Sequence, residues 1–184
     1  SIGEAAFYGP KIDFIAKDSI GRQWQVATIQ LDMNMPERFD LTCINEQGQT
    51  ERIVMIHAAI MGSIERFLSV YIEHIAGLFP VWLSPVQVKL LPISANQVEA
   101  AEQMKQQILD ICPEARIEID DRDESLGKKI REAGLEKIPY MAVIGEKEAA
   151  SQTLAIRARG NNDLGQMTVL EFSDRLSTEI KNKS

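Results

Sequence analysis

Apolar residues recur along residues 63–76 with the period of a helix. The apolar positions fall at i, i+3, i+4, i+7 and i+11, and they are Ile64, Phe67, Leu68, Tyr71 and Ile75. This is the spacing of one helical face, so the pattern predicts an amphipathic helix here. Gly77 follows directly and suits the residue after a helix C-terminus.

Before this helix, short runs of strand-forming residues predict antiparallel strands. Residues 12–16 and 23–32 flank a turn and form one predicted hairpin. Residues 40–45 and 52–57 form a second predicted hairpin around a Gly-containing turn. Residues 33–39, which contain a proline, are predicted to be a connection. This half of the chain therefore reads as an antiparallel sheet that ends in a helix.

After residue 85 strands alternate with helices. The predicted strands are 86–93, 116–120, 138–145 and 153–159, and the predicted helices are 95–111, 124–133 and a last one to about residue 180. Ser94 with Gln97, and Thr168 with Glu171, have the spacing of capping boxes. Residues 160–165 are predicted to be a turn.

The order of elements predicts an α/β (α+β) chain of two domains. Residues 1–82 carry the antiparallel sheet and the helix, and residues 83–184 form a three-layer α/β domain with a mixed sheet. The boundary lies in an apolar segment that contains Pro80 and Pro85.

Polar residues interrupt the predicted strand at residues 23–32. Thr28, Gln30 and Asp32 alternate and would line one face of a sheet, whereas Gln25 has the opposite parity. Either a β-bulge or two different environments must therefore be supposed. A face of amides and hydroxyls fits recognition of a small polar substrate, and it also fits a plain solvent-exposed face.

Composition and charge narrow the classes of protein. A hydrophobic content of 45% with 26% charged residues is typical of a globular protein. Apolar runs fall far short of the ~20 residues of a membrane helix. Cys43 and Cys112 are far apart and in no metal-like spacing. They are expected to be reduced, buried thiols of an intracellular protein.

A net charge of −7 argues against a general electrostatic clamp for nucleic acid. Between residues 128 and 160, however, seven basic and four acidic residues give a local charge of +3. This stretch is interpreted either as a focused anion-binding site or as the solvated faces of two elements, and charge alone favours the second.

Candidate chemistry begins at the start of the predicted helix over residues 63–76. Gly62, Ser63 and Arg66 share a polar side, and a helix N-terminus offers free N–H donors to a phosphate or nucleotide. These residues alone favour an ordinary amphipathic helix with a surface arginine. His57 lacks the partners of a self-contained zinc site. The sequence contains no P-loop, dinucleotide fingerprint or nucleophile elbow, so positioning and charge stabilisation are the expected means of any catalysis.

Several motifs occur together and in order. They are Ala6-Phe7-Tyr8-Gly9-Pro10-Lys11-Ile12-Asp13, Gln30-Leu31-Asp32, Met55-Ile56-His57, Gly62-Ser63-Ile64-Glu65-Arg66-Phe67, Pro80-Val81-Trp82-Leu83-Ser84-Pro85-Val86-Gln87-Val88, Lys129-Ile130-Arg131-Glu132 and Ile138-Pro139-Tyr140-Met141. Over nearly the whole chain, this set resembles the threonyl-tRNA synthetases, a family of class II aminoacyl-tRNA synthetases. The resemblance covers the C-terminal part of such an enzyme, from the end of its catalytic core with the third class II signature motif to its anticodon-binding domain.

The resemblance implies activation of threonine with ATP and Mg²⁺, followed by transfer of threonine to its tRNA. The implied catalytic residues are Lys11, Gln30 and Arg66. The implied ATP and adenylate contacts are Gln25, Thr28, Gly62, Ser63 and Arg66, and the implied threonine contacts are Tyr8 and Gln30. His57 would be one of three protein ligands of a zinc ion that selects threonine by its hydroxyl group.

The resemblance also implies partners for the second domain. The expected anticodon-binding residues are Arg131, Lys137, Glu148 and Arg157, and charged side chains of these kinds suit the edges of splayed RNA bases. A cytoplasmic protein with no membrane or DNA partner is expected. In the full-length protein a homodimer and the upstream part of the enzyme complete the set of partners.

Three positions depart from the family pattern. Ala58 stands where an arginine is usual, and Asp123 and Ser125 stand where an amide and a basic residue are usual. Two alternatives to a synthetase segment remain, namely a non-catalytic tRNA-binding or accessory module and a structural or regulatory protein. The isolated chain is expected not to activate threonine and to bind the anticodon arm weakly.

Overall fold

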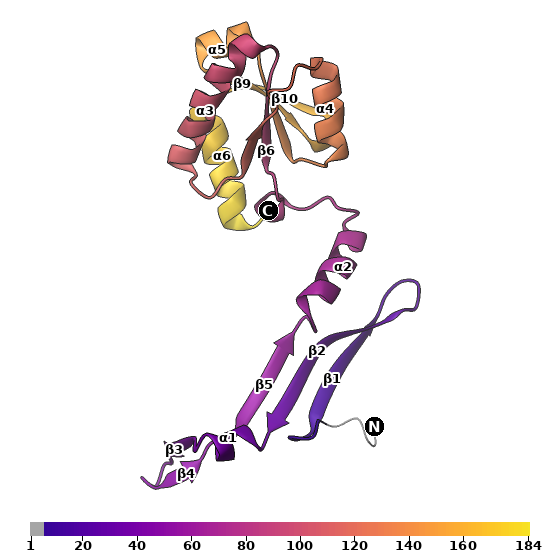
Figure 1. Ribbon diagram of the computed structural model, residues 1–184, viewed down its shortest axis with the longest axis vertical. Coiled ribbons are helices and arrows are strands. Elements are labelled where there is room, and N and C mark those ends of the chain that lie inside the picture. Colours follow the sequence, from indigo (N-terminus) through magenta and orange to yellow (C-terminus); the bar gives the residue numbers. More distant parts are fainter. Residues whose placement is uncertain (1–5) are drawn as a thin grey trace. The chain divides into compact units, whose positions relative to one another are not determined.

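The computed structural model describes residues 6–184, and it divides the chain into two units, one up to His74 and one from Ile75 onward (Figure 1). The predicted mixed α/β architecture is confirmed. No helix in the described range is long and apolar enough to cross a membrane.

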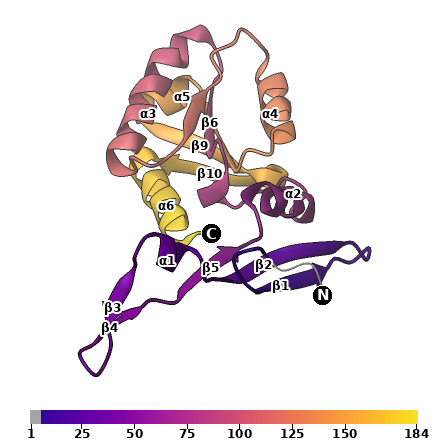
Figure 2. The ribbon, with the colours of Figure 1, turned by 60° about the horizontal axis from the view of Figure 1, so that its bottom comes forward.

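The first unit is built on a three-stranded antiparallel sheet of order β1-β2-β5. Its strands are β1 (Lys11–Lys17), β2 (Gln23–Asp32) and β5 (Met55–Ile60), and its other elements are α1 (Met35–Arg38), β3 (Thr42–Ile44), β4 (Thr50–Arg52) and α2 (Ile64–His74). The β3–β4 hairpin projects from one end of this sheet (Figure 2).

The predicted single strand over residues 52–57 is wrong. It is two strands, because β4 ends at Arg52 while β5 begins at Met55 and pairs with β2 instead of β3. Arg52 is anchored at the hairpin base, where its Nη1 donates to Pro36 O at 2.9 Å and to Asp40 Oδ1 at 2.8 Å. The predicted connection at residues 33–39 contains the short helix α1.

A β-bulge in the β1–β2 pair determines which polar residues of β2 lie on the same face of the sheet. Phe14 pairs with Ala27, but the next residue, Ile15, pairs with Gln25, so Val26 is the extra residue. The extra residue shifts Gln25 by one position and returns it to the face that carries Thr28. Of the two interpretations left open by the sequence, the structure has the bulge.

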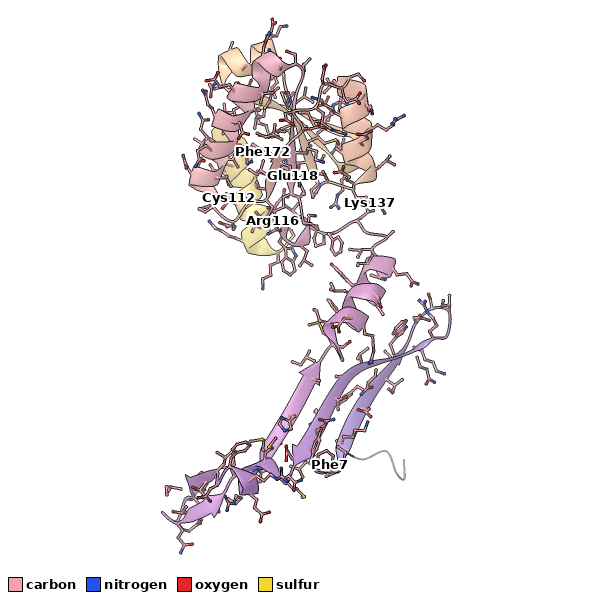
Figure 3. The ribbon with its side chains drawn as sticks, in the orientation of Figure 1. Phe7, Cys112, Arg116, Glu118, Lys137 and Phe172 are labelled. Carbon is pink, nitrogen blue, oxygen red and sulfur yellow. The ribbon has the colours of Figure 1, made fainter. Side chains whose placement is uncertain are left out.

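The first unit buries little apolar surface in its described part. The buried hydrophobic clusters contain no residue of this unit, and α2 has no buried residue. Large apolar side chains are exposed instead, with Phe7 at 92% (Figure 3) and Ile60 at 80%.

The second unit is a three-layer domain around a five-stranded mixed sheet of order β10-β9-β8-β6-β7. Its strands are β6 (Val88–Pro92), β7 (Ile117–Ile119), β8 (Tyr140–Ile144), β9 (Thr153–Ala158) and β10 (Asn162–Thr168). Its helices are α3 (Val98–Ile111), α4 (Leu126–Leu135), α5 (Glu146–Ser151), α6 (Val169–Asn182) and the short 3-10 helices η1 (Val81–Leu83), η2 (Ala95–Gln97) and η3 (Arg159–Asn161). β6 is parallel to β7 and β8, whereas β9 is antiparallel to β8 and β10.

Alternation along β8 builds the two faces of this sheet. Tyr140, Ala142 and Ile144 belong to one apolar cluster, and Met141 and Val143 belong to the other. The larger cluster is completed from α3 and α6, and the smaller one from α4, which lies on the opposite side of the sheet (Figure 1). Because successive side chains of a strand point to opposite faces, a fully apolar strand is the sign of a sheet covered on both sides.

The predicted turn over residues 160–165 is wrong. Gly160 turns the chain at φ 76° within η3, but Asn162 already starts β10. Gly165, at φ 78°, lies at a register shift within the β9–β10 pair. Gly160 therefore marks a turn and Gly165 a bulge, and the residues between them include Asn162 and Asp163, which pair with β9.

Candidate functional site

Asp13 lies at the centre of a polar cluster on the β1–β2 hairpin. Its Oδ1 accepts hydrogen bonds from Gln25 Nε2 and Thr28 Oγ1, both at 2.7 Å, and its Oδ2 lies 2.7 Å from Lys11 Nζ. The lysine ammonium and the threonine hydroxyl lower the pKa of this carboxyl group. Lys11, Gln25 and Thr28 were predicted as site residues, whereas Asp13 was not.

Arg66 joins the start of α2 to this cluster. Its Nη1 donates to the backbone oxygen of Gln25 at 3.0 Å, and its backbone N–H donates to Ser63 Oγ at 3.2 Å. Gly62, at φ 69°, allows the close approach, because a Cβ atom there would lie 2.3 Å from Gln25 O. Gly62 and Arg66 thus lie against the backbone of β2 at Gln25, and Ser63 binds the backbone of Arg66.

Asp32 organises the other end of the same strand. It is 4% exposed, and its Oδ1 accepts the backbone N–H groups of Asn34 and Met35, each at 2.9 Å. These two hydrogen bonds and the one to His57 lower its pKa. Asp32 therefore holds the start of α1, and it is a second carboxylate that sequence reasoning did not place in the site.

His57 and Tyr8 lie beside this carboxylate. His57 Nε2 is 2.8 Å from Asp32 Oδ2, and Tyr8 Oη donates to Gln30 Oε1 at 2.8 Å. The Tyr8 and His57 rings meet edge to face at 6.3 Å. Because an ionised carboxylate only accepts hydrogen bonds, Nε2 of His57 carries the proton.

The described residues do not by themselves fit a zinc ion. No group of three His, Cys, Asp or Glu side chains within residues 6–184 is close enough to hold a metal. Cys43 and Cys112 are both free, and Cys43 is exposed, so the expectation that both thiols are buried is wrong for Cys43. His57 is one possible ligand, through Nδ1, because Nε2 is engaged with Asp32.

A cavity of about 340 Å³ opens beside α4 in the second unit. Two of the predicted RNA-binding residues, Arg131 and Lys137, line it together with Arg159. Lys137 follows α4 on the side of the sheet opposite Phe172 (Figure 3). Its ammonium donates to the backbone oxygen of Ala76, and its backbone has the strained φ of 61°.

The other two predicted RNA-binding residues are not among the residues that line this cavity. Glu148 caps α5, because its Oε2 accepts the Gly145 N–H at 3.0 Å, and its Oε1 accepts Gln166 Nε2 at 2.7 Å. Arg157 lies on β9 opposite Met141 of β8. The structure thus brings together two of these four residues.

Lys129, from the same short motif as Arg131, is structural. It is 2% exposed, and its Nζ donates to Pro92 O at 3.1 Å and to Asp120 O at 2.9 Å. These bonds tie the end of β6 to the segment that leads into α4. Of the charged residues in this motif, Arg131 alone is among the residues that line the cavity.

Comparison with known families defines the class. Residues 2–75 match the family described as tRNA synthetase class II core domain (G, H, P, S and T), and residues 87–179 match the family described as Anticodon binding domain. Together they describe a class II aminoacyl-tRNA synthetase core that is followed by an anticodon-binding domain.

Curated and solved relatives narrow the class further. The threonine–tRNA ligases of Acetivibrio thermocellus and Clostridioides difficile are 55% and 51% identical to the chain over 181 residues, which are 98% of the chain. The RNA binding domain of threonyl-tRNA synthetase from Cryptosporidium parvum superposes with a TM-score of 0.80 at 38% identity, over 96% of the chain and 44% of that structure. A putative threonyl-tRNA synthetase from Aeropyrum pernix has a TM-score of 0.63 at 28% identity, over 98% of the chain and 44% of that structure.

The chain therefore belongs to the threonyl-tRNA synthetase family, which confirms the resemblance of its motifs. It spans 28% of the length of the curated relatives it matches.

Proposed function

We propose that the chain serves in the activation of threonine with ATP and in the transfer of threonine to its tRNA. The first unit would contribute contacts to the nucleotide and the amino acid, and the second would contribute contacts to the anticodon. The support is membership of the family, together with relatives named threonine–tRNA ligase.

The observation that carries this proposal is the continuity of the polar face along β2. Arg66 meets Gln25, Gln25 meets Asp13, and Gln30 meets Tyr8. Gln25 and Thr28, proposed for the nucleotide, and Gln30, proposed for threonine, thus lie on one strand. A carboxylate and an α-phosphate held beside this strand would therefore be near each other.

In this proposal each predicted residue keeps a distinct role. Arg66 stacks on the adenine and contacts the triphosphate, because a guanidinium is planar and permanently charged. Gly62 and Ser63 line the nucleotide pocket with Gln25 and Thr28. Tyr8 and Gln30 bind threonine. Lys11, held by Asp13, stabilises charge that develops on the phosphate.

In this proposal His57 would supply one ligand to a zinc ion, and Mg²⁺ would bind together with ATP. The Asp32 carboxylate accepts a hydrogen bond from Nε2 of His57 and so keeps this nitrogen protonated. Nδ1 is then the nitrogen that would bind the metal.

For the second unit we propose Arg131, Lys137, Glu148 and Arg157 as anticodon contacts. For the whole protein we propose a location in the cytoplasm and a homodimeric state, with the remaining parts of the enzyme as partners of this chain. Among these contacts, Arg131 and Lys137 are supported by the cavity that they share.

A chimaeric enzyme tests the catalytic half of the proposal. The matching segment of the Acetivibrio thermocellus relative would be replaced by this chain, and threonine-dependent ATP–pyrophosphate exchange would be measured. We expect activity in the chimaera and a loss of roughly 100-fold or more in Arg66→Ala, as for other groups that stabilise transition-state charge. Arg38→Ala, which removes an exposed arginine of α1, is the matched control. Equal activity of Arg66→Ala and the control would contradict the proposal.

The isolated chain tests the RNA-binding half. We expect it to bind the anticodon stem–loop of threonine tRNA weakly, with an affinity that falls steeply as salt is added. Arg131→Ala and Arg157→Ala should each weaken binding. Unchanged affinity in both variants would refute the anticodon assignment. Threonine activation by the isolated chain would refute the expectation that it cannot act alone.

A further inference from the structure

The cavity beside α4 is lined by three cations and an apolar wall. The cations are Arg131, Lys137 and Arg159, and the apolar residues are Leu78, Ile130, Ile138 and Met141. None of its described lining residues is acidic. The acids of α4 and its C-terminus have other partners, because Glu132 lies 2.8 Å from Arg122 and Glu136 pairs with Lys89. The positive charge of the cavity is therefore not neutralised from within.

Arg159 is the unusual member of this set. Its Nη1 is fully buried and has no hydrogen-bond partner among the described residues. Burial lowers the pKa of this guanidinium. The arginines of the same unit that brace its fold are satisfied instead, since Arg116 donates to two backbone oxygens and Arg122 to Asp120.

A buried, unpaired donor on a cation costs stability, so the fold does not gain from it. Residues that break a local rule without a structural gain are found at sites of function. The Arg159 backbone is well held, because its N–H donates to Pro139 O at 3.0 Å, so the side chain is presented from a fixed point. The guanidinium group therefore keeps hydrogen-bonding capacity that the described residues do not use.

The cavity has the dimensions and chemistry for one nucleotide. A volume of about 340 Å³ exceeds what a free phosphate fills. Gly127, Gly134 and Gly160 also line the cavity, and a Cβ at each would meet nothing within 4 Å, so there is open space beside their backbone. Guanidinium groups suit phosphate oxygens, and the apolar wall suits the face of a base.

We propose that Arg159 is a further RNA-binding residue, which holds the phosphate of one tRNA nucleotide in this cavity together with Arg131 and Lys137. This inference rests on the proposed tRNA-binding function and adds a residue that the sequence motifs did not single out.

Small ligands test the cavity without any tRNA. The guanidinium resonances of Arg159 and the amide resonances of Gly134 would be followed by NMR on the full chain. Titrations would use a nucleoside 5′-monophosphate, the matching nucleoside and inorganic phosphate. We expect the monophosphate to shift these resonances at lower concentration than either fragment, because it meets both the cations and the apolar wall. No shift with any of the three, or equal shifts with phosphate alone, would overturn the nucleotide assignment.

Arg159→Met tests the role in RNA binding and separates it from a structural role. The variant should unfold at the same or a higher urea concentration, because it removes a buried unpaired donor. It should nevertheless bind the anticodon stem–loop roughly tenfold more weakly, with a salt slope lower by about one unit. Lys181→Met, which removes one exposed charge from α6, is the control and should stay within about twofold.

The outcomes keep the two proposals apart. If the wild-type chain binds the stem–loop and Arg159→Met binds it equally well, the role of Arg159 is refuted while tRNA binding stands. Loss of stability with unchanged affinity would make Arg159 structural. If the wild-type chain does not bind the stem–loop, the proposed function fails, and the nucleotide titration alone decides whether the cavity binds nucleotides.

Discussion

Gly62 allows the start of α2 to approach β2 closely because glycine has no Cβ atom. Its φ is 69°, and a Cβ atom at this position would lie 2.3 Å from Gln25 O, so there is no room for a side chain. The Arg66 guanidinium reaches the same carbonyl oxygen. The backbone at Gly62 therefore sets the distance between α2 and β2.

Gly62→Ala should separate the helix start from the strand. We expect faster hydrogen exchange of the β2 amides near Gln25 and loss of the Arg66–Gln25 hydrogen bond. Gly48→Ala is the matched control, because Gly48 has a similar φ of 75° but nothing within 4 Å of a Cβ. Both variants carry the backbone strain of a positive φ, and only Gly62→Ala adds the clash. Equal exchange rates in the two variants would show that the clash is relieved without moving the strand.

The carboxylates show what residue-level reasoning found and what it missed. Lys11, Gln25 and Thr28 were identified through the family resemblance, but the Asp13 side chain that joins them was not. Asp32 was noticed as a polar position on its strand and as part of a motif, but it was given no role in the site. An acidic residue on a strand carries no sign of its partners in the sequence. The pairing register and the bulge decide which side chains it meets.

Asp120 gives a prediction for the pH dependence of stability. Its side chain is 4% exposed and accepts Arg122 Nε and Nη2 at 2.7 and 2.6 Å, which lowers its pKa below the ordinary 3.8. Folding thus favours the ionised form, so the stabilisation is complete above about pH 4 and is lost as the pH falls through the lowered value.

Asp120→Asn should therefore destabilise the second unit at pH 7 by about 1–2 kcal/mol, because it removes a charge from a bidentate pair whose arginine is half exposed. Urea unfolding between pH 2 and pH 7 measures this. The stability of the variant should vary less with pH at the acid end than that of the wild type. Asp174→Asn, at an exposed position of α6, is the control. Parallel pH profiles of wild type and Asp120→Asn would exclude the pair as a source of acid sensitivity.

Among the elements, the helices with capping boxes were the most predictable. Both predicted boxes are present, at η2 before α3 and at the start of α6. At α6, Thr168 Oγ1 accepts the Glu171 N–H at 3.2 Å, and Glu171 Oε2 accepts the Thr168 N–H at 2.9 Å. Such caps depend on two residues that are three positions apart, so they can be predicted from the sequence without knowledge of the tertiary structure.

Thr168→Ala removes one half of the α6 box. We expect the second unit to lose about 1 kcal/mol of unfolding free energy, the usual cost of an N-cap hydroxyl. Urea unfolding followed by circular dichroism gives the value. Thr178→Ala, which removes an exposed hydroxyl bonded to Asp174 O within the same helix, should cost less. A Thr168→Ala variant as stable as the wild type would mean that water replaces the cap.

Elements that depend on distant partners were less predictable. β4 and β5 form one run in the sequence, yet they pair with different strands. β10 was missed because Gly160 before it and Gly165 within it are typical of a turn, while its pairing with β9 is set by the sheet. The bulge in β2 was one of two open interpretations, and only the register with β1 selects it.

At the scale of the whole molecule, apolar burial is uneven. All residues of the two buried clusters belong to the second unit, where α3, α4 and α6 cover the sheet. The described part of the first unit is held by hydrogen bonds and ion pairs, such as Arg22 with Glu73 at 2.6 Å. Exposed pairs of this kind contribute little each, and a small sheet without a core is marginal.

The two tryptophans report on the two units separately. Trp24 lies on β2 of the first unit, where its Nε1 donates to Asp18 Oδ2 at 3.0 Å. Trp82 lies in η1 of the second unit, where Arg116 donates to its backbone oxygen at 2.7 Å (Figure 3 labels Arg116). In Trp24→Phe only Trp82 remains, and in Trp82→Phe only Trp24 remains.

Urea unfolding followed by fluorescence should differ between these two variants. The Trp82 signal of Trp24→Phe should change in one steep transition, because the second unit exposes a large apolar core when it unfolds. The Trp24 signal of Trp82→Phe should change at lower urea and with roughly half the slope or less, since the slope scales with the surface that unfolding exposes. Circular dichroism of each variant against the wild type checks that neither substitution itself shifts the midpoint of the second unit. Coincident transitions with equal slopes would contradict the prediction, because they would require the first unit to unfold together with a core that it does not share.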